Sequence, residues 1–248
     1  MQKLLEIAKQ RFAENDSQLV PFSKIEESNI FLNDLVHYPH AYVLACMMDR
    51  QINADQAWNI PYRVCDLLDT RDLNDLAAIP ENVYIHIFEK YKLHRFNTSM
   101  AKVFHSTLVQ IRDVYEGDAS KIWSGNPSSA TVVYRFLQFH GSGVKIATMA
   151  ANILARQFRI PFSDYYSIDI SPDVHVKLVL SRLGMVDKNA SNDQIIYKAR
   201  EINPEFPGII DFSCWEIGKY WCHPTHPDCD NCIMKEECHF HQQSPDSI

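Results

Sequence analysis

Residues 136–147 read Phe-Leu-Gln-Phe-His-Gly-Ser-Gly-Val-Lys-Ile-Ala and decide how the middle of the chain folds. Apolar residues on both sides have helical spacing, and Gly141 and Gly143 stand between them in a chain with only seven glycines. Glycine adopts positive φ values and lets the backbone approach another group closely. The stretch therefore predicts a helix, a tight turn formed by His140, Gly141, Ser142 and Gly143, and a second helix.

The turn has two interpretations. At the mouth of the second helix its backbone amides would point outward and bind a phosphate without any charged side chain. Alternatively, the glycines only relieve steric crowding at a corner between two helices. The turn alone leaves both interpretations open.

Helical periodicity continues on both sides of this stretch. Apolar residues recur every three or four positions over residues 97–117, and shorter apolar runs cover 41–48 and 132–139. Ser191 and Gln194 form a capping box ahead of another helical pattern. Alternation typical of strands is scarce, so the sequence predicts an all-α protein. Prolines such as Pro61 predict turns between its helices.

Composition narrows the class of protein. The 248 residues are 46% hydrophobic and 22% charged, which is ordinary for a soluble globular protein with one large core or two modest ones. The formal charge of −7 argues against a protein that coats nucleic acid through bulk charge. No apolar run is long enough to cross a bilayer. Charged residues occupy the place where a secretory signal needs an apolar core, so we expect a reducing compartment.

Four cysteines near the end of the chain predict a metal centre. Six, two and five residues separate Cys222, Cys229, Cys232 and Cys238. Four thiolates in one short loop suit a four-iron, four-sulfur cluster, whereas structural zinc usually takes two tightly spaced pairs. Zinc remains the alternative cofactor because four histidines of the same loop are also ligand types: His223, His226, His239 and His241. Disulfide bonds among these four cysteines are a third interpretation.

Three further cysteines have a simpler interpretation. Cys46, Cys65 and Cys214 lie on apolar runs. Free cysteine behaves there as a small hydrophobic residue, so we expect all three to be buried and without a chemical role.

Lys145 and Asp173 are the candidate catalytic residues. Lys145 begins the helix after the glycine turn, where the helix dipole and a partly dry pocket would favour a neutral, nucleophilic amine. Asp173 begins another helix, within Ser-Pro-Asp-Val-His at residues 171–175. The simpler interpretations are a phosphate-contacting lysine and a carboxylate that only caps its helix.

Glycine turn, lysine, aspartate and cysteine loop, in that order, resemble the helix-hairpin-helix DNA glycosylases of the endonuclease III family over about residues 38–238. The resemblance implies that Lys145 is the Schiff-base lysine, that Asp173 is the catalytic aspartate and that the cysteine loop holds a 4Fe-4S cluster. It implies base excision repair of double-stranded DNA containing a damaged base or an abasic site. The damaged base would be flipped out and removed, and β-elimination would then nick the strand.

Further residue roles come from the same resemblance. Gln51 resembles the glutamine that fills the gap left by the flipped base, and Leu93 or His94 would assist it. The hairpin residues His140, Gly141, Ser142 and Gly143 would contact DNA. Oxidised pyrimidines are the expected substrates, with 8-oxoguanine as the alternative.

Two other functions stay open. One is a monofunctional glycosylase in which Asp173 activates water. The other is a non-catalytic iron-sulfur protein that binds nucleic acid.

The resemblance also predicts two helical domains. A six-helix barrel would cover residues 33–158, and residues 1–32 with 159–248 would form a second domain that carries the cluster, with DNA in the groove between them. The chain departs from the family at His140-Gly-Ser-Gly143, where the first position is commonly proline, and in an insertion over residues 160–167. We expect a monomer without membrane association, in the cytoplasm of a bacterium or archaeon and associated with the nucleoid.

Overall fold

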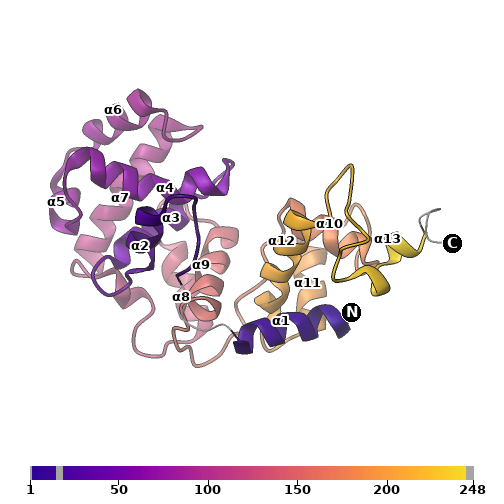
Figure 1. Cartoon of the computed structure of the whole chain (residues 1–248). Coiled ribbons are helices and arrows are strands. Elements are labelled where there is room, and N and C mark those ends of the chain that lie inside the picture. Colours follow the sequence, from indigo (N-terminus) through magenta and orange to yellow (C-terminus); the bar gives the residue numbers. More distant parts are fainter. Residues whose placement is uncertain (1, 15–18, 244–248) are drawn as a thin grey trace. The chain divides into compact units, whose positions relative to one another are not determined.

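The structure is a computed structural model that describes residues 2–14 and 19–243 (Figure 1). Helices joined by loops make up this part of the chain, and no strand occurs within it. The predicted all-α class is therefore confirmed. None of the helices in the described residues combines the length and apolar composition that a bilayer-spanning segment needs.

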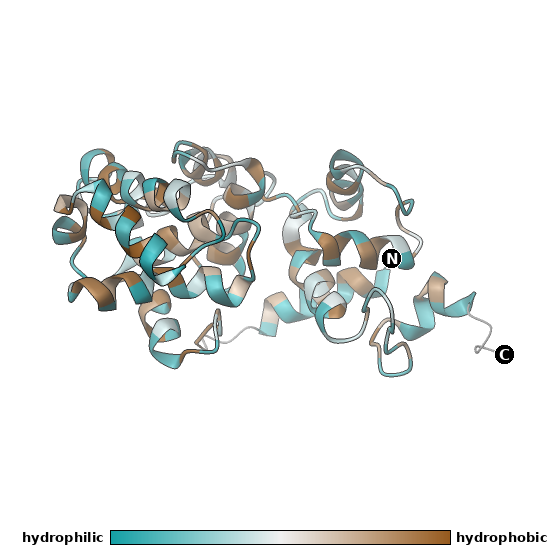
Figure 2. Cartoon of the chain, turned by 90° about the horizontal axis from the view of Figure 1, so that it is seen from above, coloured by the Kyte–Doolittle hydropathy of each residue, from teal (hydrophilic) through white to brown (hydrophobic). Residues whose placement is uncertain are grey.

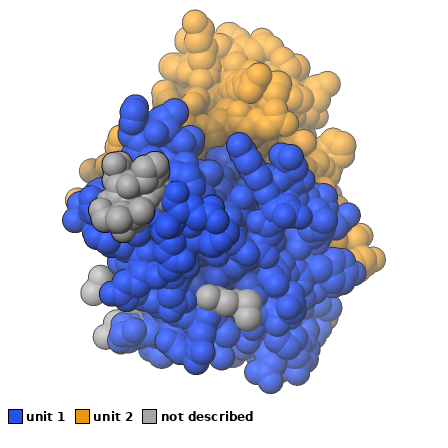
Figure 3. Space-filling view, turned by 90° about the vertical axis from the view of Figure 1, so that its right-hand side faces the viewer, with its two compact units in different colours: residues 1–16, 128–130, 151–248 blue, residues 17–127, 131–150 orange. Residues whose placement is uncertain are grey.

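The chain divides into two compact units, coloured separately in Figure 3. Unit 1 comprises residues 1–16, 128–130 and 151–248, and unit 2 comprises residues 17–127 and 131–150. Compared with the predicted segments, residues 17–32 group with unit 2, and residues 128–130 and 151–158 group with unit 1. The first difference arises because α2 (Glu26–Asn33) packs against the next two helices. Residues 1, 15–18 and 244–248 of the predicted second domain lie outside the described residues.

Unit 2 is built around α3 (Pro39–Met48), all ten residues of which are buried. A helix that is apolar all round must be surrounded by protein. Here the helices that surround it are α2, α4 (Ala54–Leu68), α7 (Asn97–Val114) and the short η1 (Ala119–Ile122). The remaining helices that contribute to unit 2 are α5 (Leu73–Ala78), α6 (Glu81–Tyr91), α8 (Ser129–Leu137) and α9 (Val144–Arg156).

The helices expected over 97–117, 41–48 and 132–139 are present as α7, α3 and α8. Along α7 the periodic apolar residues all face the core: Met100, Phe104, Leu108, Ile111 and, just after the helix, Tyr115. Figure 2 shows the corresponding mixture of hydrophobic and hydrophilic residues along the helices. Amphipathic periodicity was thus a sufficient signal for α7.

The turn predicted at Pro61 is wrong, because Pro61 lies inside α4. A proline inside a helix removes one backbone hydrogen bond and costs about 3 kcal/mol. Its side chain is buried together with those of Trp58, Ile60 and Val64. Burial of this apolar face outweighs the local preference of proline.

Unit 1 contains α1 (Gln2–Glu14), α10 (Val174–Arg182), α11 (Asn192–Ile202), η2 (Pro207–Ile210), α12 (Asp211–Tyr220), η3 (Lys235–Glu237) and α13 (His239–Gln242). The capping box at the start of α11 is confirmed: Ser191 Oγ accepts the Gln194 N–H at 3.2 Å, and Gln194 Oε1 accepts the Ser191 N–H at 2.8 Å. Helices α10 and α12 pack closely at Gly218, where an added Cβ would lie 2.6 Å from the Cβ of His175. Only glycine permits that approach.

Candidate functional site

The hairpin of unit 2 forms as the glycines predict. Gly141 has φ +82°, in the region that favours glycine, and Ser142 donates its N–H to Phe139 O at 2.9 Å. An added Cβ on Gly141 would lie 3.0 Å from Val103 Cγ2 and 3.1 Å from Arg50 Nη1, whereas one on Gly143 would meet nothing within 4 Å. The two glycines therefore differ: Gly141 is required by the fold, and Gly143 keeps the outer side of the turn open.

The amides of the turn are only partly available to a ligand. The Ser142 N–H is used inside the turn, contrary to the expectation that the amides point outward together. In the described part of the chain, no backbone acceptor is found for the N–H groups of Gly141 and Gly143. The first amides of α9 lack intrahelical acceptors by geometry. These groups can hold an anion, and His140 is exposed beside them.

Lys145 is the second residue of α9 and is exposed, in contrast to the partly dry pocket expected from the sequence. Two residues earlier, Gly143 accepts the Ala147 N–H at 3.0 Å and starts the helix. The amine is thus carried on a regular helix directly after the hairpin.

Gln51 lies in the loop after α3 and is exposed. Its φ is +56°, a left-handed conformation that is uncommon for a residue with a side chain. The preceding turn is closed by a hydrogen bond from Arg50 N to Met48 O at 2.8 Å. Strained backbone of this kind concentrates at functional sites.

The structure contradicts the gap-filling role predicted for Leu93 or His94. The Leu93 side chain is completely buried and His94 is 2% exposed, so neither protrudes to fill a gap in DNA. His94 instead ties its own loop to the end of α3: its Nδ1 accepts the Phe96 N–H at 3.0 Å, which leaves Nε2 to donate to Met48 O at 3.2 Å. Burial lowers the pKa of His94 and keeps the imidazole neutral for this role. The loop is further fixed by a bond from Gln56 Nε2 to Leu93 O at 2.9 Å.

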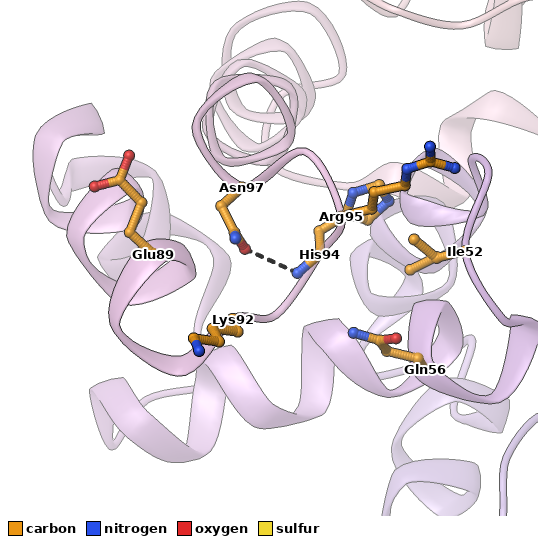
Figure 4. Close-up of a pocket in the computed structure, with 7 residues that line it drawn as sticks. All are labelled: Ile52, Gln56, Glu89, Lys92, His94, Arg95 and Asn97. Atoms are coloured by element: carbon orange, nitrogen blue, oxygen red, sulfur yellow. Dashed lines mark hydrogen bonds between the residues drawn. The ribbon is translucent and has the colours of Figure 1, made fainter.

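An open pocket lies between the loop that carries His94 and the start of α4 (Figure 4). It has a volume of about 530 Å³ and is lined by Ile52, Gln56, Glu89, Lys92, His94, Arg95 and Asn97. The exposed residues of its loop are Arg95 and the neighbouring Phe96, whose ring centroid lies 5.3 Å from the Arg95 guanidinium carbon. The sequence did not identify Arg95 and Phe96 as candidates. They differ from Leu93 and His94 in exposure, which residue type alone does not predict.

Asp173 lies in unit 1 as the N-cap of α10, where its Oδ1 accepts the Val176 N–H at 2.8 Å. The extended segment before it is held at several points. Ile168 O accepts the Gly208 N–H at 2.7 Å, and Asp169 forms a two-bond ion pair with Arg200 at 2.7 and 2.8 Å. The capping role expected of Asp173 is present, and it uses only one carboxylate oxygen.

A second carboxyl group, that of Asp211, lies near Asp173. Asp211 Oδ2 accepts the Ser171 N–H at 3.0 Å. The pKa of Asp211 is raised to about 7, chiefly by burial and also by the Asp173 charge, while the Ser171 amide and Arg156 oppose the shift. Sequence reasoning missed Asp211 because 40 residues separate it from Ser171.

The four cysteines of the terminal loop line one small cavity of about 20 Å³, together with Arg182, Trp221, Lys235, Phe240 and His241. In residues 2–14 and 19–243 no three histidine, cysteine or acidic side chains lie close enough to hold a single metal ion. Burial raises the pKa of Cys222, Cys229 and Cys232, and the neighbouring thiolates add to the shift. Four thiols that line one cavity are a donor set whose chemistry suits an iron-sulfur cluster or zinc.

Arg182 organises this loop from the end of α10. Its Nη1 donates to Cys222 Sγ at 3.3 Å and to His223 O at 2.8 Å, and its Nη2 donates to Pro224 O at 2.9 Å. The guanidinium also stacks 4.5 Å from the centre of the Phe240 ring. One side chain thus fixes the start of the loop and contacts a candidate ligand.

The other three cysteines are buried, as predicted. Cys46 and Cys214 are completely buried and Cys65 is 1% exposed. Burial raises the pKa of all three, to about 12 for Cys65, so they stay protonated. They act as small hydrophobic residues.

The chain resembles known proteins in part of its sequence and in its fold. No family model matches the chain. A stretch of 75 residues is 31% identical to endonuclease III of Thermotoga maritima and covers 30% of this chain and 35% of that protein. The match thus spans about a third of the length of this curated relative.

Solved structures match almost the whole chain. A trapped covalent intermediate of endonuclease III with DNA, in an estranged-adenine complex, has a TM-score of 0.62 at 18% identity, covering 97% of this chain and 94% of the other. A non-covalent endonuclease III–DNA complex has a TM-score of 0.61 at 18% identity, covering 96% and 93%. A thermostable thymine-DNA glycosylase has a TM-score of 0.63 at 12% identity, covering 98% of each chain. The resemblance predicted from the sequence is confirmed at the level of fold.

Proposed function

We propose that this chain, which has the endonuclease III fold, is a DNA glycosylase that removes a damaged base from double-stranded DNA and then nicks the strand at the abasic site. The observation that carries the proposal is the similarity in fold, over nearly the whole chain, to endonuclease III bound to DNA, combined with a lysine directly after the hairpin. The similarity to a curated endonuclease III over 75 residues supports the same reading.

The hairpin would hold the DNA backbone. The amides of Gly141 and Gly143 and the first amides of α9 would bind a phosphate, and these contacts need no basic side chain. This explains how a chain with a formal charge of −7 can bind DNA. The phosphate contacts would set the register of the damaged nucleotide relative to Lys145.

Lys145 and Asp173 would carry the chemistry. The Asp173 carboxylate would stabilise the positive charge that develops on the sugar as the base leaves. The Lys145 amine would bond to C1′ as the departing base takes the electron pair of the broken glycosidic bond. The proton released by the amine would pass through Asp173 to O4′ as the C1′–O4′ bond breaks, which leaves an iminium at C1′. The iminium acidifies the C2′ proton, and loss of that proton expels the 3′ phosphate by β-elimination.

The gap left by the flipped base would be filled from two loops. Gln51, held in a strained exposed turn, is the first candidate. Arg95 and Phe96 are the second, because they are exposed on the loop that His94 ties to the end of α3. An arginine over an aromatic ring presents a flat surface on which a base can stack.

The cysteine loop would hold a 4Fe-4S cluster with Cys222, Cys229, Cys232 and Cys238 as ligands. With all four thiolates bound, such a cluster has no open coordination position and would shape the loop without entering the reaction. Arg182 would donate a hydrogen bond to a ligating sulfur. Zinc remains the alternative, and the absorbance near 400 nm of the purified protein distinguishes the two.

Incision of duplex oligonucleotides tests the proposal. The substrates would carry an oxidised pyrimidine, 8-oxoguanine, uracil or an abasic site, with an undamaged duplex as control. We expect the wild type to act on the oxidised pyrimidine and the abasic site, and Asp173→Asn to lose base removal while retaining binding. Equal incision by the wild type and Asp173→Asn would reject the role of Asp173.

A monofunctional glycosylase is the second candidate, because the fold is equally similar to a thymine-DNA glycosylase, with a TM-score of 0.63. In that case Asp173 would activate water and Lys145 would contact a phosphate. The strand would then break only after alkali treatment of the product. Breakage without alkali supports the bifunctional enzyme.

A further inference from the structure

Asp211 is an acidic residue whose side chain bonds to the turn that carries Asp173. It is half-buried at the first position of α12, and its Oδ2 accepts the N–H of the buried Ser171 at 3.0 Å. This bond crosses from α12 to the segment that precedes α10. Asp211 therefore fixes one end of the turn over residues 171–173.

The turn itself is tight. Ser171 O accepts the Asp173 N–H at 2.7 Å, and Asp173 O accepts the Lys177 N–H at 3.0 Å, which starts α10. Asp173 Oδ1 is directed to the Val176 N–H. Because these bonds follow one another along the backbone, a shift of Ser171 would move the Asp173 carboxylate.

The charges that face Asp211 come from three elements. Asp173 at the start of α10 raises its pKa, Arg156 at the end of α9 lowers it, and the buried Cys214 on α12 stays protonated. The α1 helix, which also packs on α12, contributes Arg11, but that side chain pairs with Glu216. The pKa of Asp211 thus responds to one carboxylate, which raises it, and to one guanidinium, which lowers it.

We infer that Asp211 is a positioning residue for Asp173: its carboxyl group holds the Ser171 amide and so fixes the direction of the Asp173 carboxylate. The inference rests on the proposed function of Asp173. With a proton on Asp211 the site carries one negative charge, which belongs to Asp173. Loss of that proton places a second, repelling charge beside the turn and disturbs the position of Asp173.

A pH dependence follows. Burial gives Asp211 a pKa of about 7, so the proton is lost within the range in which a glycosylase is assayed. We expect the single-turnover rate of base removal by the wild type to fall as the pH rises through about 7. Asp211→Asn retains an oxygen acceptor for the Ser171 N–H but cannot ionise.

The experiment compares the single-turnover rates of the wild type, Asp211→Asn, Asp211→Ala and Glu216→Gln between pH 5.5 and 8.5. Asp211→Asn should keep its low-pH rate and lose the decline near pH 7. Asp211→Ala, which lacks the acceptor, should be slower about tenfold at every pH. Glu216→Gln removes an acid from the same helix without touching the turn, and should keep the wild-type profile. Circular dichroism and duplex binding check that each variant is folded.

Identical pH profiles for the wild type and Asp211→Asn, with an unchanged rate for Asp211→Ala, would overturn the inference. Asp173→Asn is measured alongside. If it has no effect on base removal, the proposed function of Asp173 fails and the inference fails with it. If it abolishes base removal while the Asp211 variants match the wild type, only the inference fails.

Discussion

The two candidate catalytic residues are held in their units by different means. Lys145 in unit 2 follows a local hairpin, in which the hydrogen bonds of the turn join residues three or four positions apart. Asp173 in unit 1 follows a segment fixed by contacts with α11, η2 and α12, such as the Asp169–Arg200 ion pair and the Ser171–Asp211 bond. The amine depends on local backbone geometry, whereas the carboxylate depends on long-range packing. Substitutions at the two sites should therefore differ in how far their effects spread.

The largest effect on stability is expected at Gly208 of unit 1. An added Cβ would lie 2.8 Å from the backbone oxygen of Ile168, at the point where Gly208 N–H donates to that same oxygen. Asn152 Nδ2 also donates to Gly208 O at 2.9 Å. We expect Gly208→Ala to lower the free energy of unfolding by about 3 kcal/mol, measured by urea denaturation. A loss below about 0.5 kcal/mol would mean that this contact does not fix the segment before Asp173.

A smaller effect is expected at the hairpin of unit 2. Gly141→Ala forces alanine to a φ of +82° and brings its Cβ within 3.0 Å of Val103. We expect a loss of about 2 kcal/mol in the free energy of unfolding. Gly143→Ala is the matched control, since its Cβ would meet nothing within 4 Å, and should change stability by less than about 0.5 kcal/mol. Equal losses in the two variants would contradict the difference between the glycines.

Arg182 tests whether long-range packing also governs the cysteine loop. Arg182→Lys keeps the charge but loses the planar guanidinium group, whose nitrogens donate to Cys222, His223 and Pro224. We expect absorbance near 400 nm to be lost about tenfold faster in the presence of a chelator. Lys198→Ala removes a cation of α11 that pairs with Glu201 and does not line the cysteine cavity, and it should behave as the wild type. Equal rates of loss in the wild type and Arg182→Lys would show that Arg182 does not support the centre.

The smallest effect is a pH dependence of stability at Asp211. Its pKa is about 7 in the folded protein against 3.8 as the ordinary value. Because the folded pKa is raised, protonated Asp211 favours folding fully below about pH 4, and this contribution is lost as the pH rises toward 7. We expect the free energy of unfolding of the wild type, relative to Asp211→Asn, to fall by about 1 to 2 kcal/mol between pH 5 and 8. A constant difference would contradict the raised pKa.

The contrast between local geometry and long-range packing also explains which features the sequence could predict. Helices α3, α7 and α8, the capping box at Ser191 and the glycine turn all depend on residues within a few positions of one another, and local patterns were sufficient for them. The helical course of α4 through Pro61 depends on burial against other helices, which a local rule does not include.

Among the candidate functional residues, too, local features were predictable and tertiary contacts were not. Lys145 at the start of α9 and Asp173 as a helix N-cap were predictable from local sequence. The burial of Leu93 and His94, the exposure of Arg95 and Phe96, and the bond from Ser171 to Asp211 depend on tertiary contacts. Residue type does not specify them.

Borohydride trapping on a duplex with an abasic site tests the central claim most directly, because reduction of the imine links the protein to DNA only if an amine has bonded to C1′. We predict a covalent complex with the wild type and none with Lys145→Gln, while Lys177→Gln, on a different helix, gives the wild-type yield. Absence of the complex with the wild type, or an undiminished yield with Lys145→Gln, would contradict the assignment of Lys145 as the nucleophile.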